Sequence, residues 1–190
     1  MPVAAASSHP DLPIQLLGKL LLADPSLRGG PFQRSVIFLA EHHASRGAYG
    51  LVLNHPTGKT VSDFLTGSDF TALGKLPVHE GGPVEPDQLT FSAFWWSPKT
   101  GFRSAIRLSA LDAAKHAGRP GRIVHAFLGY SGWTAGQLEE ELRRSSWFPT
   151  PPPLNLISHP HDATLWTQLM RHLSPLHRIL AEAPDDPTLN

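Results

Sequence analysis

The amino-acid sequence predicts a single α+β domain built from short strands and short helices. Apolar runs rich in β-branched residues alternate with patterns typical of helices, without a regular strand–helix–strand rhythm. The 19 prolines and 16 glycines also cut the chain into brief elements. A chain of 190 residues suits one domain, which we expect over residues 14–184, between flexible tails at 1–13 and 185–190.

The first part of this domain is predicted to contain three strands. They are QLLGKLLLA (15–23), SVIFLAE (35–41) and YGLVLN (49–54). A Gly-Gly-Pro turn separates the first two, and a polar loop joins the last two as a hairpin. A short helix is expected over 60–65, because Thr60 is a good N-cap residue and Gly67 supplies a stop.

The middle of the domain is predicted to be richer in strands. PVHEGGPV (77–84) is interpreted as a strand interrupted by a turn, and the aromatic LTFSAFWW (89–96) is expected to pair with 101–108. Ser109 and Gly118 bracket a helix. The run RIVHAFL (122–128) is almost continuously apolar, which predicts a central strand buried on both faces.

The stretch GYSGWTAGQLEEEL (129–142) follows that central strand directly. Its glycines predict a tight turn, and Thr134 with Gln137 matches a capping box at the start of a helix. Two Glu–Arg pairs spaced four residues apart support this helix, Glu139 with Arg143 and Glu140 with Arg144. A phosphate site at the turn is disfavoured, because the stretch lacks a Walker lysine and the spacing of either Gly-rich fingerprint.

The C-terminal part is predicted to be a proline-rich connector followed by two helices. WFPTPPPLNLIS (147–158) has polyproline character and room for a short edge strand. Apolar residues at helical spacing predict a helix over 162–173, and Pro175 begins a second one that ends before Pro184.

Composition excludes several classes of function. Sixteen basic and 16 acidic residues cancel, which argues against a broad basic face for nucleic acid. The chain has no cysteine, so disulfides, thiolate catalysis and cysteine-based metal sites are excluded and the cytoplasm is the expected location. The N-terminal segment lacks the pattern of a signal peptide, and no long apolar run predicts a membrane span.

Four segments in a fixed order carry a resemblance to a known family. They are GKLLLADPSL with FQRSVIFLAEH, GAYGLVLNHP, HEGGPV and GYSGWTAGQLEEEL. Together they resemble the YqgE/AlgH family of small bacterial proteins. The resemblance implies a compact α+β fold whose bifurcated, mostly antiparallel sheet partly closes into a small barrel flanked by helices. It implies no established activity, and His55 stands where the family usually has an arginine.

The candidate site is a cleft between the sheet and its flanking helices. We expect Asn54, Gly81, Gly82, Tyr130 and Trp133 near it, because strand ends, glycine turns and polar groups coincide at these positions. The favoured function is a cytoplasmic, non-enzymatic regulatory or binding protein whose partner is a small molecule or another protein. We predict no cofactor, no nucleic acid, no membrane and no catalytic set.

Two alternatives stay open. One is an enzyme centred on a histidine or serine, with His55, His125 and Ser131 as candidates, with or without a metal ion. Histidines neighbour acids at Glu41–His43, His79–Glu80 and His159–Asp162, but none of these has the spacing of a known metal motif, so no metal site is predicted. The other is a transcriptional regulator, although we find no helix-turn-helix or basic recognition helix.

Overall fold

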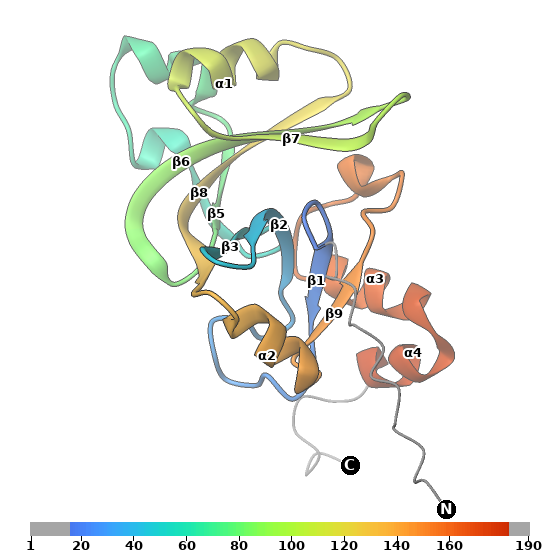
Figure 1. Ribbon diagram of the computed structural model, residues 1–190. Helices are drawn as coiled ribbons and strands as arrows, with labels where there is room; N and C mark the ends of the chain where they lie inside the picture. Colours follow the sequence, from blue (N-terminus) through green and yellow to red (C-terminus); the bar gives the residue numbers. More distant parts are fainter. Residues whose placement is uncertain (1–15, 183–190) are drawn as a thin grey trace, which may run out of the picture.

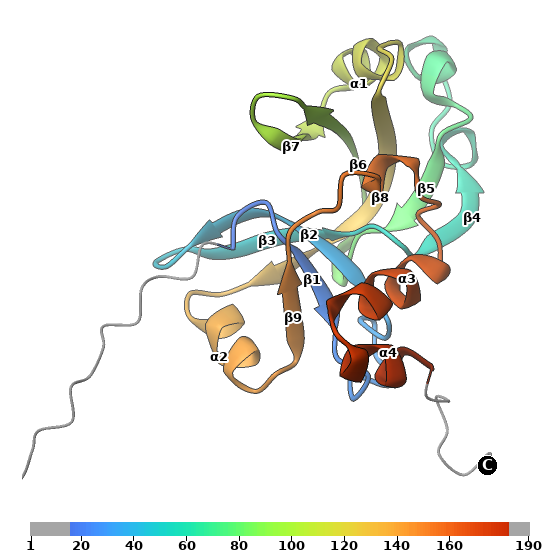
Figure 2. The ribbon, with the colours of Figure 1, turned by 90° about the vertical axis from the view of Figure 1, so that its right-hand side faces the viewer.

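The computed structural model describes residues 16–182. The tails predicted at 1–13 and 185–190 lie outside the described residues. The chain forms a nine-stranded mixed sheet that curls into a half-barrel, with short helices around it (Figures 1 and 2). The α+β class and the bifurcated, partly closed sheet are therefore confirmed. None of the helices in residues 16–182 is both long and apolar enough to cross a membrane.

The strands are β1 (Leu20–Ala23), β2 (Val36–His43), β3 (Gly47–Val52), β4 (Pro56–Thr60), β5 (Pro77–Glu80), β6 (Val84–Ser97), β7 (Gly101–Leu108), β8 (Arg122–Trp133) and β9 (Trp147–Thr150). The α-helices are α1 (Ala110–Ala117), α2 (Gln137–Arg143), α3 (Thr164–Leu173) and α4 (Pro175–Glu182). Three 3₁₀ turns complete the description, η1 (Val61–Asp63), η2 (Ser68–Leu73) and η3 (Leu156–Ser158).

The sheet divides into two arms that share strand β8. Arm A has the order β9-β1-β2-β3 and pairs through β3 with residues 131–133 of β8. Arm B contains β4, β5, β6 and β7, and it pairs with the first half of β8 through parallel β5 on one side and antiparallel β6 on the other. One edge of β8 therefore changes partner, from β5 to β3, partway along the strand.

Gly81 lies where the partner changes. Its N–H donates to the Leu128 carbonyl of β8 at 2.7 Å, and its carbonyl accepts from the Val52 N–H of β3 at 3.0 Å. A Cβ atom on Gly81 would lie 2.3 Å from the Gly129 carbonyl oxygen, so only glycine fits this backbone contact. The two Gly-rich motifs of the sequence thus meet at the fork of the sheet.

Three apolar clusters stabilise the arms. One fills the half-barrel and continues under α3 and α4; it includes Phe38, Phe94 and Trp166. A second lies between arm A and α2, and a third between arm B and α1. Figure 1 shows these helices at different places around the sheet. Successive residues of β1 and β2 enter different clusters, which is why both strands have continuously apolar sequences.

Some predicted elements differ from the structure. The helix expected over 60–65 is the 3₁₀ turn η1, with the Asp63 side chain accepting from the Thr60 N–H at 2.7 Å. Strand β4 and turn η2 were not expected, because their sequences are polar and short. The tight turn predicted for 129–133 is wrong, because β8 runs without a break to Trp133.

The capping box predicted at Thr134 is also only partly correct, because α2 begins at Gln137 after Gly136 in the left-handed region. The Gln137 side chain does reach back to the Thr134 N–H, at 3.1 Å. Of the two Glu–Arg pairs, Glu140–Arg144 forms at 2.7 Å, whereas Glu139 bonds to His42 of β2 at 2.8 Å. One glutamate of α2 therefore stabilises the helix internally, and the other ties the helix to arm A.

The close backbone contact at the fork predicts that one added methyl group at Gly81 strongly lowers the free energy of unfolding. Gly81→Ala should destabilise the fold by about 2–4 kcal/mol, because its Cβ meets backbone that must shift. Gly30→Ala is the matched control, since a Cβ there meets nothing within 4 Å, and it should change stability by less than about 0.5 kcal/mol. Urea denaturation of both variants measures the difference; equal stabilities would contradict this role of Gly81.

Candidate functional site

The five residues predicted for a shared cleft lie in three places. Tyr130 and Trp133 line one pocket, and Asn54 lines a second. Gly81 and Gly82 lie at the fork, where added Cβ atoms would meet the backbone of residues 129–131. Tyr130 and Trp133 are therefore the pair that the structure brings together around one cavity.

The Asn54 side chain, just after β3, is hydrogen-bonded to the backbone at the start of β2. It is buried, its Oδ1 accepts from the Val36 N–H at 2.7 Å, and its Nδ2 donates to the Arg34 carbonyl at 2.9 Å. Both bonds fix the entry to β2. The adjoining pocket of about 340 Å³ also includes His55 and Glu80. Burial lowers the pKa of His55, so its imidazole is neutral at pH 7.

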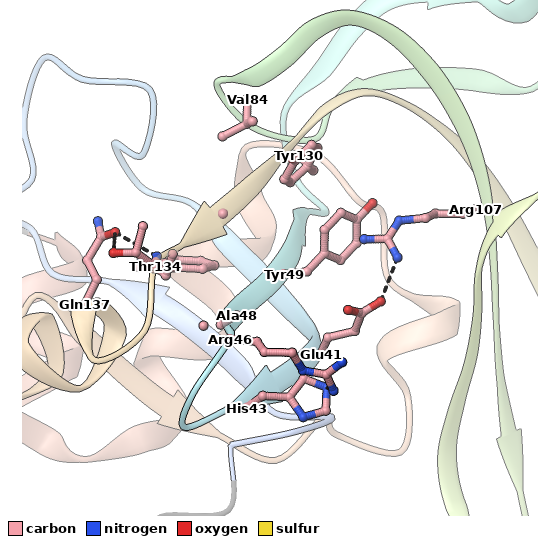
Figure 3. Close-up of a pocket in the computed structure, with 13 residues that line it drawn as sticks. Glu41, His43, Arg46, Ala48, Tyr49, Val84, Arg107, Tyr130, Thr134 and Gln137 are labelled. Atoms are coloured by element: carbon pink, nitrogen blue, oxygen red, sulfur yellow. Dashed lines mark hydrogen bonds and ion pairs between the residues drawn. The ribbon is translucent and has the colours of Figure 1, made fainter.

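A pocket of about 480 Å³ lies between the two arms, and we call it the fork pocket. Its walls come from β2 and β3 of arm A, from β6 and β7 of arm B, and from the end of β8 (Figure 3). The residues that line it are Glu41, His43, Arg46, Gly47, Ala48, Tyr49, Val84, Arg107, Tyr130, Gly132, Trp133, Thr134 and Gln137.

Arg107 reaches across the fork pocket from arm B to arm A. Its Nη1 donates to Glu41 Oε1 at 2.7 Å, and its Cζ lies 4.0 Å from the centre of the Tyr49 ring. Irregular pairing sets both side chains: one extra residue interrupts β2 between Leu39 and Glu41, and β7 carries an extra residue opposite Ser92. Such bulges redirect side chains, and Arg107 itself has φ +53°.

Aromatic rings form the floor of the pocket. The ring centres of Tyr49 and Tyr130 lie 4.9 Å apart, and Trp133 also lines the pocket. Burial raises the pKa of the Tyr49 phenol, an effect that the Arg107 guanidinium partly offsets. The phenol therefore stays protonated at neutral pH and can donate a hydrogen bond.

Trp133 is held in place from behind by helix α2. The Glu141 carboxylate accepts from the indole N–H of Trp133 at 2.8 Å and from that of Trp147 at 2.7 Å. The Glu141 carboxylate of α2 thus links this helix to both β8 and β9. Because both indole donors are satisfied there, the polar groups facing the pocket come from other residues, chiefly Arg46, Arg107 and Glu41.

Sequence reasoning missed these charged residues. Glu41 and Arg107 are 66 positions apart, and each lies in an ordinary strand pattern. Arg46 is in the loop between β2 and β3. Only the pairing register and the two bulges reveal that the three side chains share a pocket, and single-sequence patterns do not indicate where bulges fall.

Three buried histidines form a separate cluster, packed against Phe94 and Phe127 of the apolar cluster that fills the half-barrel. His161 Nε2 donates to the Leu156 carbonyl at 3.0 Å, which leaves its Nδ1 to accept from His125 Nε2 at 2.9 Å. His79 Nε2 donates to the His161 carbonyl at 3.0 Å. These bonds fasten the segment before α3 to strands β5 and β8; we call the three residues the histidine latch.

The latch residues titrate at low pH. Burial lowers the pKa of His79 to about 4, lowers that of His161, and lowers that of His125 well below its usual range. Each ring is therefore neutral at pH 7. A protonated His161 would lose the lone pair that accepts from His125, so protonation opposes the folded arrangement.

Neither of the catalytic candidates in the core is exposed. Ser131 has no accessible surface, and its hydroxyl donates to the Gly81 carbonyl at 3.2 Å. His125 is buried against Phe94 and Phe127 and bonded to His161. Within residues 16–182, no group of three histidine or acidic side chains is arranged to hold a metal ion.

The latch predicts that stability falls as the pH is lowered from about 6.5 to about 4. In that window the unfolded chain binds more protons than the folded one, so each latch histidine contributes a slope of up to ~1.4 kcal/mol per pH unit. Urea denaturation at a series of pH values measures the slope.

Two variants serve as comparisons for this slope. His125→Phe should make it shallower, because one buried titrating ring is removed and its neighbours are aromatic. The exposed His172 provides the control, and His172→Gln should leave the slope unchanged. A wild-type stability that stays constant between pH 6.5 and pH 4.5 would contradict the account of the latch.

Comparison with known sequences gives the same family over most of the chain. A family model described as AlgH-like, DUF179, matches residues 20–177. The UPF0301 protein SCO2948 of Streptomyces coelicolor is 34% identical, over 92% of this chain and 95% of the relative. A UPF0301 protein of Chlorobium phaeobacteroides is 31% identical over 91% of this chain and 95% of its own length.

Two solved structures have a similar fold. Protein DIP2367 from Corynebacterium diphtheriae superposes with a TM-score of 0.69 at 20% identity, covering 94% of this chain and 95% of that one. The solution structure of the AlgH protein from Pseudomonas aeruginosa gives a TM-score of 0.62 at 26% identity, covering 93% and 99%. The sequence matches and the shared fold together establish that this chain belongs to the AlgH-like family.

Proposed function

We propose that this protein is a cytoplasmic, non-enzymatic binding protein with a regulatory role, and that its small-molecule ligand occupies the fork pocket. The observation that supports this most is that one cavity of about 480 Å³ is walled by both arms of the sheet and by the segment leading into α2. This size falls within the roughly 300–1,000 Å³ of typical ligand sites.

The lining favours binding over catalysis. A few polar groups converge above an aromatic floor, as in sites that orient a ligand. The hydroxyl of Thr134 is bonded to the Gln137 side chain at 3.2 Å, and His43 accepts from Arg46 at 3.0 Å. The lining residues thus lack a nucleophile paired with a base, which hydrolysis through a covalent intermediate requires.

A ligand in this pocket would touch elements that belong to different arms. Differential contact with two arrangements of the arms is what allows a ligand to shift a protein between conformations. The Arg107–Glu41 bond is the point where such a shift would act, because it joins β7 to β2 across the pocket. The lack of cysteine supports a cytoplasmic location for this role.

A pocket-filling variant tests the proposal. A Cβ at Gly132 would point toward Tyr130 and Val84, both of which line the fork pocket, and the contact with the Tyr130 ring at 3.1 Å needs only a small side-chain shift. Gly132→Val should therefore fold and have a smaller cavity. The purified protein is incubated with a bacterial metabolite extract, washed, and examined by mass spectrometry for retained small molecules.

The control adds a methyl group at a residue of the other pocket. Gly30 lines the cavity beside Asn54, and a Cβ there meets nothing within 4 Å. We expect a retained mass with the wild type and with Gly30→Ala, and at least a tenfold reduction with Gly132→Val. Equal retention by all three proteins, or no retained mass at all, would contradict the proposal.

A further inference from the structure

We infer that the ligand of the fork pocket is a planar organic anion, a flat ring that carries a carboxylate or a phosphate ester. This inference rests on the proposed function, and it specifies the chemistry that the pocket recognises. Three features of the lining support it: an excess of positive charge, guanidinium groups with unused donors, and an exposed flat ring.

The charge of the pocket is positive. Arg46 and Arg107 line it together with a single carboxylate, that of Glu41. Glu41 is bonded to Arg107 at 2.7 Å. The hydrogen-bond partner of Arg46 is the His43 imidazole, which its Nη2 reaches at 3.0 Å and which supplies no negative charge. One guanidinium charge is therefore uncompensated among the lining residues, and an anionic ligand would balance it.

The geometry of Arg107 suits a carboxylate or phosphate. A guanidinium carries five N–H donors in one plane; the Glu41 carboxylate accepts from one of them, and the Tyr49 hydroxyl is a second hydrogen-bonding neighbour. Its stacking at 4.0 Å on Tyr49 fixes that plane. In Figure 3, Arg107 from β7 and Arg46 from the loop between β2 and β3 both lie on the Glu41 side of the pocket. A fixed planar group of donors binds planar or tetrahedral oxyanions in two-bond arrangements.

The flat part of the ligand is matched by Tyr130. Tyr130 is partly exposed and lines the pocket, while Tyr49 supports it at a ring distance of 4.9 Å. Gly132 has no side chain to cover the Tyr130 ring, since a Cβ there would already lie 3.1 Å from it. The face of Tyr130 is therefore accessible for stacking with a planar ring.

Four probes separate the parts of this inference. Benzoate and adenosine monophosphate are flat anions, one a carboxylate and the other a phosphate ester; benzamide is flat and neutral; inorganic phosphate is an anion without a ring. Titration calorimetry at low ionic strength compares them on the wild type. We expect at least one flat anion to bind at least tenfold more tightly than both benzamide and inorganic phosphate.

Charge variants make the test specific to the arginines. Arg46→Gln and Arg107→Gln should each weaken binding of the flat anion by about tenfold or more. Glu41→Gln should strengthen it, because a competing carboxylate is removed. Arg103→Gln is the control, since Arg103 is exposed on β7 but does not line the fork pocket, and it should leave the affinity unchanged.

The outcomes distinguish this inference from the proposed function. If benzamide binds as tightly as benzoate, and the arginine variants bind like wild type while Gly132→Val does not, the pocket binds ligands but the anion inference is wrong. If no probe binds and the extract yields no retained mass, both are wrong. If inorganic phosphate binds as tightly as the flat anions, the inference that the pocket recognises a flat ring is wrong.

Discussion

The structure depends on one backbone contact, the crossing of Gly81 and Gly129 at the fork of the sheet. Gly81 bonds to β8 through its N–H and to β3 through its carbonyl, so a single residue joins both arms. The arms can approach this closely only because neither glycine has a side chain: a Cβ on Gly129 would lie 2.4 Å from the Gly82 carbonyl oxygen. The sheet divides there, and the space between its arms becomes the fork pocket.

Two further contacts join parts of the fold that are distant in the sequence. The Arg107–Glu41 bond spans the pocket between the two arms, and both of its side chains are half-exposed. The histidine latch ties the segment before α3 to β5 and β8. An exposed ion pair contributes roughly 0–1 kcal/mol, whereas buried hydrogen-bonded groups are costly to disrupt. The Arg107 contact is therefore the one that a ligand can exchange without unfolding the domain.

Sequence reasoning predicted the fold well where burial decides the pattern. Strands β1, β2 and β8 lie between two apolar clusters, so their runs of apolar residues identify them. It failed where glycine serves close packing inside a strand, because 129–133 has the composition of a turn but belongs to β8. It predicted Tyr130 and Trp133 for a shared site but missed Arg46 and Arg107, since bulges and loop geometry place those guanidinium groups and leave no local signature.

The most direct test of the central claim is where a flat anion binds. Two-dimensional amide NMR spectra recorded with increasing benzoate would locate it residue by residue. If the anion binds in the fork pocket, the shifts should concentrate at Gly47 and Ala48 of β3, Gly132 of β8 and Thr134, all of which line it. Shifts confined to Gly30 and Gln33 of the second pocket, or no shifts around Gly132 at saturating benzoate, would contradict it.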